Sequence, residues 1–271
     1  MKKGINKMLN TEKCRNRFIE YVKDFDQTDT MISRKVSHTI RVADYSKEIA
    51  ESLKLNKIDV DLAYIIGILH DIGRFRQVTE CRNYSDKIGL GHAKIGDIIL
   101  FEENMITEFV DSREYDTLIR QAVLNHSFFK IKDDVTGDAL TFAKIVRDAD
   151  KLDIFNLFTF DDPIQMGEDS GYVNNDLVTK EVKDAFFNGK QITKDNLNTL
   201  MDWFINMIGF VFDLNYKRSF EILAEKEFLK QIFSIMKDIK KDNNELVGLL
   251  NDMEIYINNY IGEKVNKNTL V

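Results

Sequence analysis

The apolar run Ala63-Tyr64-Ile65-Ile66-Gly67-Ile68-Leu69 leads directly into His70-Asp71-Ile72, and Gly73 closes the stretch. Residues 59–71 are almost entirely apolar beyond their first turn, and this pattern predicts a helix buried in the middle of the fold. The sequence therefore places a histidine and a carboxylate at the buried end of a central helix.

A buried carboxylate without a partner is costly, and a cation is the partner that serves both side chains at once. Adjacent residues do not face each other along a helix. The side chains of His70 and Asp71 can still reach one ion at the end of the helix, where the last turn becomes irregular before Gly73. We infer that His70 and Asp71 are both metal ligands.

The other histidines support a metal site. Each lies in or beside a segment with apolar periodicity, and an acidic cluster, residues 147–153, follows the last of them. A single histidine on an apolar face is usually a core residue, so the inference depends on the whole set. Imidazole together with carboxylate suits Fe, Mn, Co, Ni or Zn rather than Ca. The remaining histidines are His38, His92 and His126.

Composition indicates a folded globular chain without many helix breakers. Of 271 residues, 44% are hydrophobic and 31% charged, with 13 glycines and one proline, which favours an all-α fold. The net charge of −7 argues against a nucleic-acid polymer as partner but allows a local basic pocket. No apolar run is long enough for a membrane span, no signal peptide is evident, and the two cysteines fit a reducing compartment. We expect a cytoplasmic protein that does not contact a membrane.

Apolar periodicity predicts ten helices, and residues 74–91 between two of them read as a polar loop. Residues 1–158 are expected to form the metal-binding core, and 159–176, with the only proline, Pro163, a connecting loop. Residues 177–271 are expected to form a C-terminal helical extension packed on the core, with a possible homodimer surface. The predicted helices span residues 11–25, 32–53, 59–71, 92–101, 114–126, 138–158, 177–187, 195–213, 216–239 and 244–262.

The order His38, His70-Asp71, Asp150 resembles the H…HD…D signature of the HD-domain superfamily. Residues 67–74 and 149–153 match the two most recognisable blocks of that family. Gly91-His92-Ala93 and Leu124-Asn125-His126 match the two extra histidines of its dinuclear subgroups. The resemblance covers about residues 30–158.

Two departures narrow the resemblance. Ser127 follows His126 where some dinuclear relatives have paired histidines. The Gly-Tyr-Pro motif of the cyclic-dinucleotide esterases does not occur in the sequence, which argues against that branch.

The resemblance implies an all-α HD-domain helical bundle with one or two divalent transition-metal ions in its middle. It implies that His92 and His126 bind a second metal and that Asp71 bridges the two ions. Asp148 and Asp153 are interpreted as carboxylates outside the metal's own ligands. The implied ligands of the first metal are His38, His70, Asp71 and Asp150.

Most relatives are phosphohydrolases, so we expect hydrolysis of a small phosphate ester or nucleotide by a metal-activated water. Asp71 would be catalytic through the metals. Lys151, beside Asp150, is expected to neutralise a developing oxyanion. Four basic residues between two ligands are candidates for binding phosphate, with Arg74 foremost. They are Arg74, Arg76, Arg82 and Lys87.

Two other functions remain open at this point. The same six ligands also serve relatives that cleave C–C or C–P bonds with O₂, so a di-iron oxygenase is an alternative. A non-catalytic metal-binding regulatory module is the other. Ligand identity does not separate the hydrolase from the oxygenase, whereas the complete ligand set argues against the regulatory module.

Overall fold

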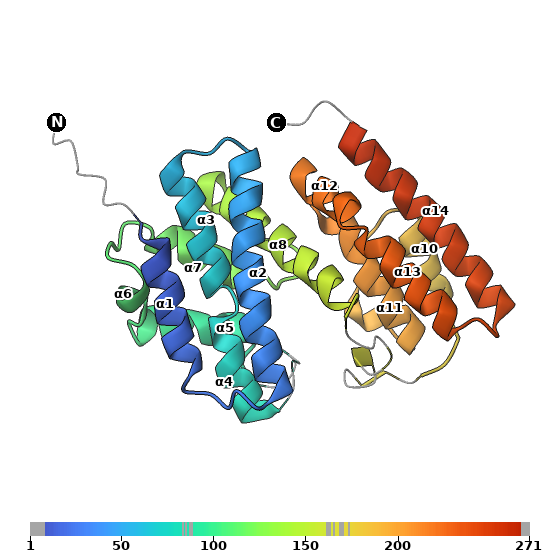
Figure 1. The fold of residues 1–271 in the computed structure, drawn as a ribbon, viewed down its shortest axis with the longest axis horizontal. Coiled ribbons are helices and arrows are strands. Elements are labelled where there is room, and N and C mark those ends of the chain that lie inside the picture. Colours follow the sequence, from blue (N-terminus) through green and yellow to red (C-terminus); the bar gives the residue numbers. More distant parts are fainter. Residues whose placement is uncertain are drawn as a thin grey trace. The chain divides into compact units, whose positions relative to one another are not determined.

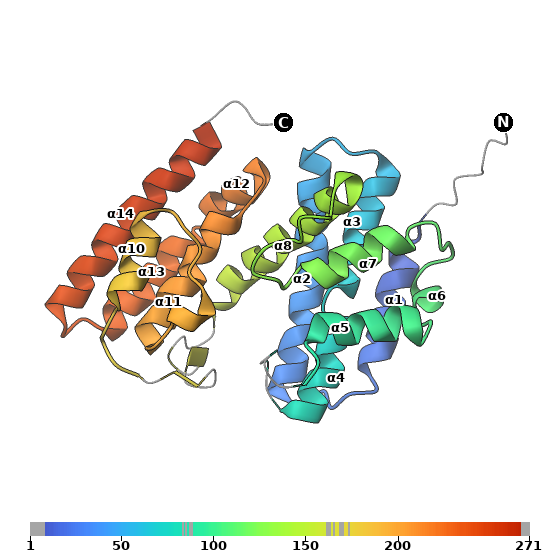
Figure 2. The same ribbon diagram turned by 180° about the vertical axis from the view of Figure 1, so that it is seen from behind.

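The computed structural model of the chain describes residues 9–82, 84, 86, 89–160, 164, 166–167, 171–172 and 174–266. Within these residues every regular element is a helix and none is a strand, which confirms the predicted all-α fold. The chain divides into two compact units, Met1–Asp150 and Lys151–Val271, and each is a bundle of helices (Figure 1, Figure 2). Among the described helices, none is both long and apolar enough to cross a membrane.

The first unit contains the helices that the sequence predicts around the metal site, and two further helices, α4 and α6. Helix α8 begins in this unit and continues into the second. The elements are α1 (Thr11–Val22), α2 (Thr30–Ser52), α3 (Lys57–Leu69), α4 (Ile72–Cys81), α5 (His92–Asp97), the π-helical turn η1 (Ile98–Glu102), α6 (Ile106–Phe109), α7 (Asp116–Asn125) and α8 (Gly137–Leu157).

Helix α3 is the buried centre of the first unit, as predicted. Every residue from Val60 to Leu69 is buried, and α1, α2 and α7 all pack against it. A β-carbon added at Gly67 would lie 2.6 Å from the Cα of Ala43 in α2. The missing side chain therefore lets the backbones of α2 and α3 approach closely, and this approach brings the metal-site residues of the two helices together.

The chain turns sharply at the end of α3. Only two residues separate α3 from α4, and Asp71 there has φ −106° and ψ 17°, outside the helical region. The predicted polar loop over 74–91 is wrong for its first half, because α4 continues to Cys81. Phe75 and Val78, three residues apart, are both buried and stabilise α4 against the rest of the unit.

Helices α4 and α5 cross at a pair of glycines. A β-carbon at Gly73 would lie 2.2 Å from the carbonyl oxygen of His92 and 2.4 Å from the amide nitrogen of Gly96. Both atoms belong to the backbone of α5, so they cannot swing aside. Glycine at position 73 thus fixes how closely the first residue of α5 approaches the end of α3.

The second unit is a separate bundle with an aromatic core. Its buried side chains include Phe186, Phe204 and Phe233, and α14 packs against α10, α12 and α13. The predicted helix over 216–239 is two helices, because the chain breaks at Glu227, which has a left-handed φ of 52°. Beyond α8, the elements are α10 (Lys180–Phe187), η2 (Lys194–Asn196), α11 (Leu200–Ile208), η3 (Gly209–Asp213), α12 (Lys217–Glu225), α13 (Phe228–Ile239) and α14 (Asn244–Asn266).

The predicted end of the core at residue 158 lies one residue after the end of α8 at Leu157. The two compact units, by contrast, divide at Asp150, inside that helix. Pro163, in the predicted connecting loop, lies outside the described residues. The packing of the extension on the core and the homodimer surface stay predictions.

Candidate metal centre

Six predicted ligands come together inside the first unit, each from a different position in the bundle. They lie on α2, directly after α3, between α3 and α4, at the start of α5, directly after α7, and on α8. Five of the six are buried and Asp150 is partly exposed. The six residues are His38, His70, Asp71, His92, His126 and Asp150; we call them the histidine–aspartate cluster.

One half of the cluster gathers around Asp150. The Nε2 atom of His38 lies 3.2 Å from Asp150 Oδ1, and Nε2 of His70 lies 3.8 Å from the same oxygen. Both Nε2 atoms are 3.7 Å from Oδ2 of Asp71. His38, His70 and Asp150 thus form one group with the spacing that a metal ion requires.

The other half gathers around the second oxygen of Asp71. Oδ1 lies 3.2 Å from Nε2 of His92 and 3.7 Å from Nε2 of His126. The two Nε2 atoms are 2.9 Å apart. The two oxygens of Asp71 therefore face different histidine pairs.

Hydrogen bonds behind the cluster fix which nitrogen of three histidines carries the proton. Nδ1 of His70 donates to the carbonyl of Gly67, and Nδ1 of His126 donates to the carbonyl of Val123, each over 2.7 Å. Nδ1 of His92 lies 2.7 Å from Oδ1 of Asp86. A carbonyl or ionised carboxylate only accepts, so Nδ1 of each ring carries a proton and Nε2 points into the cluster.

The protonation states of the cluster suit a metal at neutral pH. Burial lowers the pKa of His70 to about 3 and that of His92 to about 4, so both rings are neutral. Burial raises the pKa of Asp71, but Lys35, His70 and Arg74 lower it further, to well below its usual range. Burial likewise opposes ionisation of Asp150, whose pKa His38 nevertheless holds below the usual range. Neutral imidazole and ionised carboxylate are the forms that coordinate metals.

The cluster leaves buried acceptors that protein donors do not satisfy. Nε2 of His70 and Oδ1 of Asp71 are inaccessible to solvent and have no hydrogen-bonding partner among the described residues. Nε2 of His92 and Nε2 of His126 lie 2.9 Å apart beside them. Each unsatisfied buried group costs about 1–3 kcal/mol. A divalent cation would satisfy all of them, so these residues fit the metal.

The candidate residues for binding phosphate occupy different places. Arg74 is buried beside the cluster, with Nε 3.7 Å from Oδ1 of Asp71. Arg76 pairs instead with Glu103, and Arg82 pairs with Asp29. Lys87 lies outside the described residues.

Lys151 lies next to Asp150 in the sequence, but its ammonium group is 2.7 Å from Asp213 and lies over the ring of Phe210. These contacts belong to the second unit and favour a structural role for this lysine. Its predicted role at an oxyanion has no support in these contacts.

Two residues at the site do not stand out in the sequence. Lys35 lies one turn before His38 on α2, and its Nζ is 2.7 Å from Oδ2 of Asp71. The sequence signal that points to Lys35 is its position three residues before the predicted ligand His38. Asp86 accepts hydrogen bonds from both the ring and the amide of His92, but no apolar periodicity in the sequence points to it.

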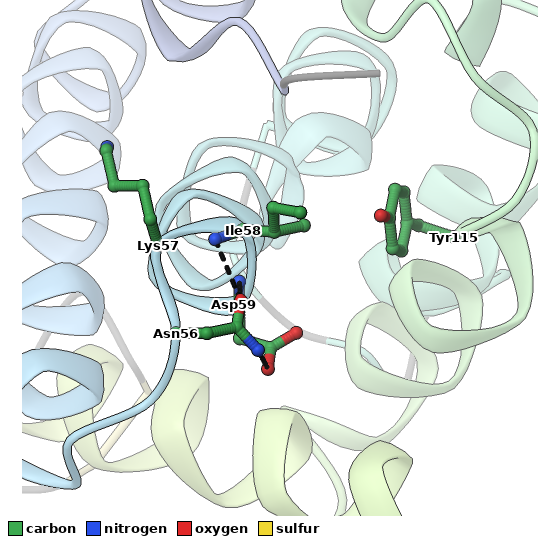
Figure 3. Close-up of a pocket in the computed structure, with 5 residues that line it drawn as sticks. All are labelled: Asn56, Lys57, Ile58, Asp59 and Tyr115. Carbon is green, nitrogen blue, oxygen red and sulfur yellow. Dashed lines mark hydrogen bonds between the residues drawn. The ribbon is translucent and has the colours of Figure 1, made fainter. Parts of the chain in front are cut away.

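A shallow hollow lies at the opposite end of α3, separate from the cluster (Figure 3). It lies where α3 and α7 begin, whereas the cluster lies where both helices end. Asn56 there accepts hydrogen bonds from the amides that begin α3. The hollow is lined by Asn56, Lys57, Ile58, Asp59 and Tyr115.

Comparison with known families agrees with the geometry. Residues 36–154 match the sequence model of the HD domain, a range that contains the whole histidine–aspartate cluster. These residues are therefore similar to the HD domain, a domain that binds divalent metals and whose superfamily consists mostly of metal-dependent hydrolases. No curated protein and no solved structure gives a significant match to the chain.

Proposed function

We propose that the chain is a phosphohydrolase that uses two divalent metal ions to cleave a small phosphate ester or a nucleotide. The observation that carries the proposal is the position of Asp71, whose two oxygens face different pairs of Nε2 atoms at 3.2–3.7 Å. Two bridged ions are the usual means of hydrolysing a phosphate ester in one displacement.

The ligand assignment follows the two halves of the cluster. One ion would be held by His38, His70, Asp150 and Oδ2 of Asp71. The second would be held by His92, His126 and Oδ1 of Asp71. Metals bound there supply positive charge that polarises the phosphate and lowers the pKa of a water molecule.

The chain's own residues prepare the centre for this chemistry. The hydrogen bonds from Nδ1 keep the three rings oriented, so their Nε2 atoms do not have to rotate when a ligand binds. Arg74 is held by the carbonyl of Tyr84 at 2.9 Å. Its Nε lies 3.7 Å from Asp71 and, although buried, has no hydrogen-bonding partner among the described residues. We assign it to the binding of the phosphate group, which a fixed guanidinium binds well.

The proposal is tested by phosphate release from a panel of nucleotides and small phosphate esters, with Mn²⁺, Co²⁺, Ni²⁺ and Fe²⁺ in turn. Asp71→Asn should abolish release. Asp61→Asn is the matched control, because Asp61 is also a buried aspartate of this region but pairs with Lys57 far from the cluster. Release that survives Asp71→Asn would contradict the site. Metal-loaded protein that releases no phosphate but consumes O₂ with a substrate would indicate the oxygenase instead.

A further inference from the structure

Among the described residues, Lys35 is the cation closest to the carboxylate of Asp71. Its Nζ lies 2.7 Å from Oδ2 of Asp71, the oxygen that also faces Nε2 of His38 and His70 at 3.7 Å. The side chain is 16% exposed, so the ammonium lies at the edge of the cluster rather than deep within it. Lys35 thus uses the oxygen through which Asp71 would bind the first metal.

An ammonium group and a divalent ion cannot share that oxygen without strong repulsion. Two like charges a few Å apart in a poorly solvated site repel each other strongly. Metal binding would therefore weaken the contact between Lys35 and Asp71 and leave the ammonium without its hydrogen-bonding partner.

Lys35 and Arg74 differ in how firmly they are held. The guanidinium of Arg74 is fixed by the side chain of Gln77 and the carbonyl of Tyr84. Asp71 is the hydrogen-bonding partner of Lys35 among the described residues. The four-carbon side chain of lysine is flexible, so Lys35 can move when a metal ion binds Asp71.

Tyr84 keeps both cations beside the centre. The Lys35 ammonium lies 5.6 Å from the centre of the Tyr84 ring, and the Arg74 guanidinium lies 5.7 Å from it. The ring is held in turn by a 2.8 Å hydrogen bond from its hydroxyl to the carbonyl of Met31. A lysine displaced from Asp71 therefore stays near the ring and near Arg74, where two positive charges suit a dianionic phosphate group.

We propose that Lys35 exchanges partners: it binds Asp71 when the centre holds no metal, and it binds the phosphate of the substrate when metal is present. This inference rests on the proposed phosphohydrolase function. It assigns to Lys35 two opposite effects, one on the binding of metal and the other on the binding of phosphate.

The test measures Mn²⁺ affinity and then the affinity of the Mn²⁺-loaded protein for inorganic phosphate, by calorimetry. Lys35→Met should bind Mn²⁺ about tenfold more tightly, because a competing positive charge is gone. It should bind phosphate about tenfold more weakly. Lys35→Arg should retain phosphate binding. Lys47→Met is the control, since Lys47 lies on the same helix but near Glu51 at the surface.

The outcomes separate this inference from the proposed function. Wild-type protein that binds no Mn²⁺ would overturn the function and the inference together. Lys35→Met with unchanged phosphate affinity, or with weaker Mn²⁺ binding, would overturn the role of Lys35 alone. If Lys35→Met does not fold, Lys35→Gln carries the same expectations, because it keeps a long polar side chain without the charge.

Discussion

Replacing Gly73 with alanine should both destabilise the first unit and weaken the second metal site. The added carbon would lie 2.2 Å from the carbonyl oxygen of His92, whereas real contacts of this kind are essentially never under 3.0 Å. Helices α4 and α5 would have to separate by about 0.8 Å, the difference of those two distances. Because the obstructing atoms are backbone, no side chain can rotate to relieve the clash.

The size of the effect follows from this separation. Overpacking of a well-packed contact costs about 1–3 kcal/mol. For a unit of this size, each kcal/mol lowers the melting temperature by about 2–4 °C, so a loss of roughly 2–12 °C is expected. If α5 moves as a rigid body, Nε2 of His92 moves away from Oδ1 of Asp71, now 3.2 Å distant. Binding at the site of His92 and His126 should weaken by about 10–100-fold.

Thermal melting of the metal-free protein and a Mn²⁺ titration would measure the two effects. The site of His38, His70 and Asp150 should keep its affinity, because none of its residues lies on α5. Gly248→Ala is the control, since a β-carbon there meets nothing within 4 Å in helix α14. A Gly73→Ala protein that melts like the wild type and binds two ions with unchanged affinity would refute the reasoning.

Three further predictions concern the surroundings of the centre and the effect of metal. Asp86→Ala should weaken binding of the second metal ion by about 10–100-fold, because His92 loses the acceptor that orients its ring. Equilibrium dialysis with Mn²⁺ measures this affinity, and an unchanged affinity would show that Asp86 does not support the site. Burial raises the pKa of Asp97, but Arg120 and Lys94 lower it further, to below the ordinary 3.8. The ionised carboxylate of Asp97 therefore stabilises the fold above pH 3.8, and this stabilisation is lost as the pH falls through the lowered pKa. In denaturant unfolding, Asp97→Asn should lower the free energy of unfolding by about 1–3 kcal/mol at neutral pH and by less in acid. A destabilisation that grows in acid would contradict the ion pairs. Mn²⁺ at about 100 times its Kd should stabilise the wild type by about 2.7 kcal/mol, EDTA should reverse the gain, and Asp71→Asn should reduce it strongly; equal stabilisation of the variant would exclude Asp71 as a ligand.

The residues of the candidate metal centre can be predicted from the sequence because short stretches of sequence indicate them. The apolar run before His70 predicts burial of α3, and the histidines fall in or beside segments with apolar periodicity, so each ligand has a definite place in a helical bundle. Which Nε2 atoms face which oxygen of Asp71 depends on helix crossings, and the sequence does not give crossing distances. Gly73 and Gly96 show this, since their role appears only where two backbones meet.

The parts that sequence reasoning missed have different physical reasons. Helix α4 lies in a stretch with many charged residues, so the buried Phe75 and Val78 were too sparse to outweigh them. The break at Glu227 needs a left-handed backbone at a residue that does not favour it, so tertiary packing sets it. Asp86 lies six residues before His92 in the sequence, and no helical spacing rule connects the two.

The proposed centre depends most directly on Asp71 joining two metal ions. Electron paramagnetic resonance of protein loaded with two equivalents of Mn²⁺ would test this, because bridged Mn²⁺ ions are magnetically coupled and isolated ions are not. We predict the spectrum of a coupled pair in the wild type and in Asp61→Asn, and its loss in Asp71→Asn. A wild-type spectrum of isolated Mn²⁺ alone would contradict the bridged centre.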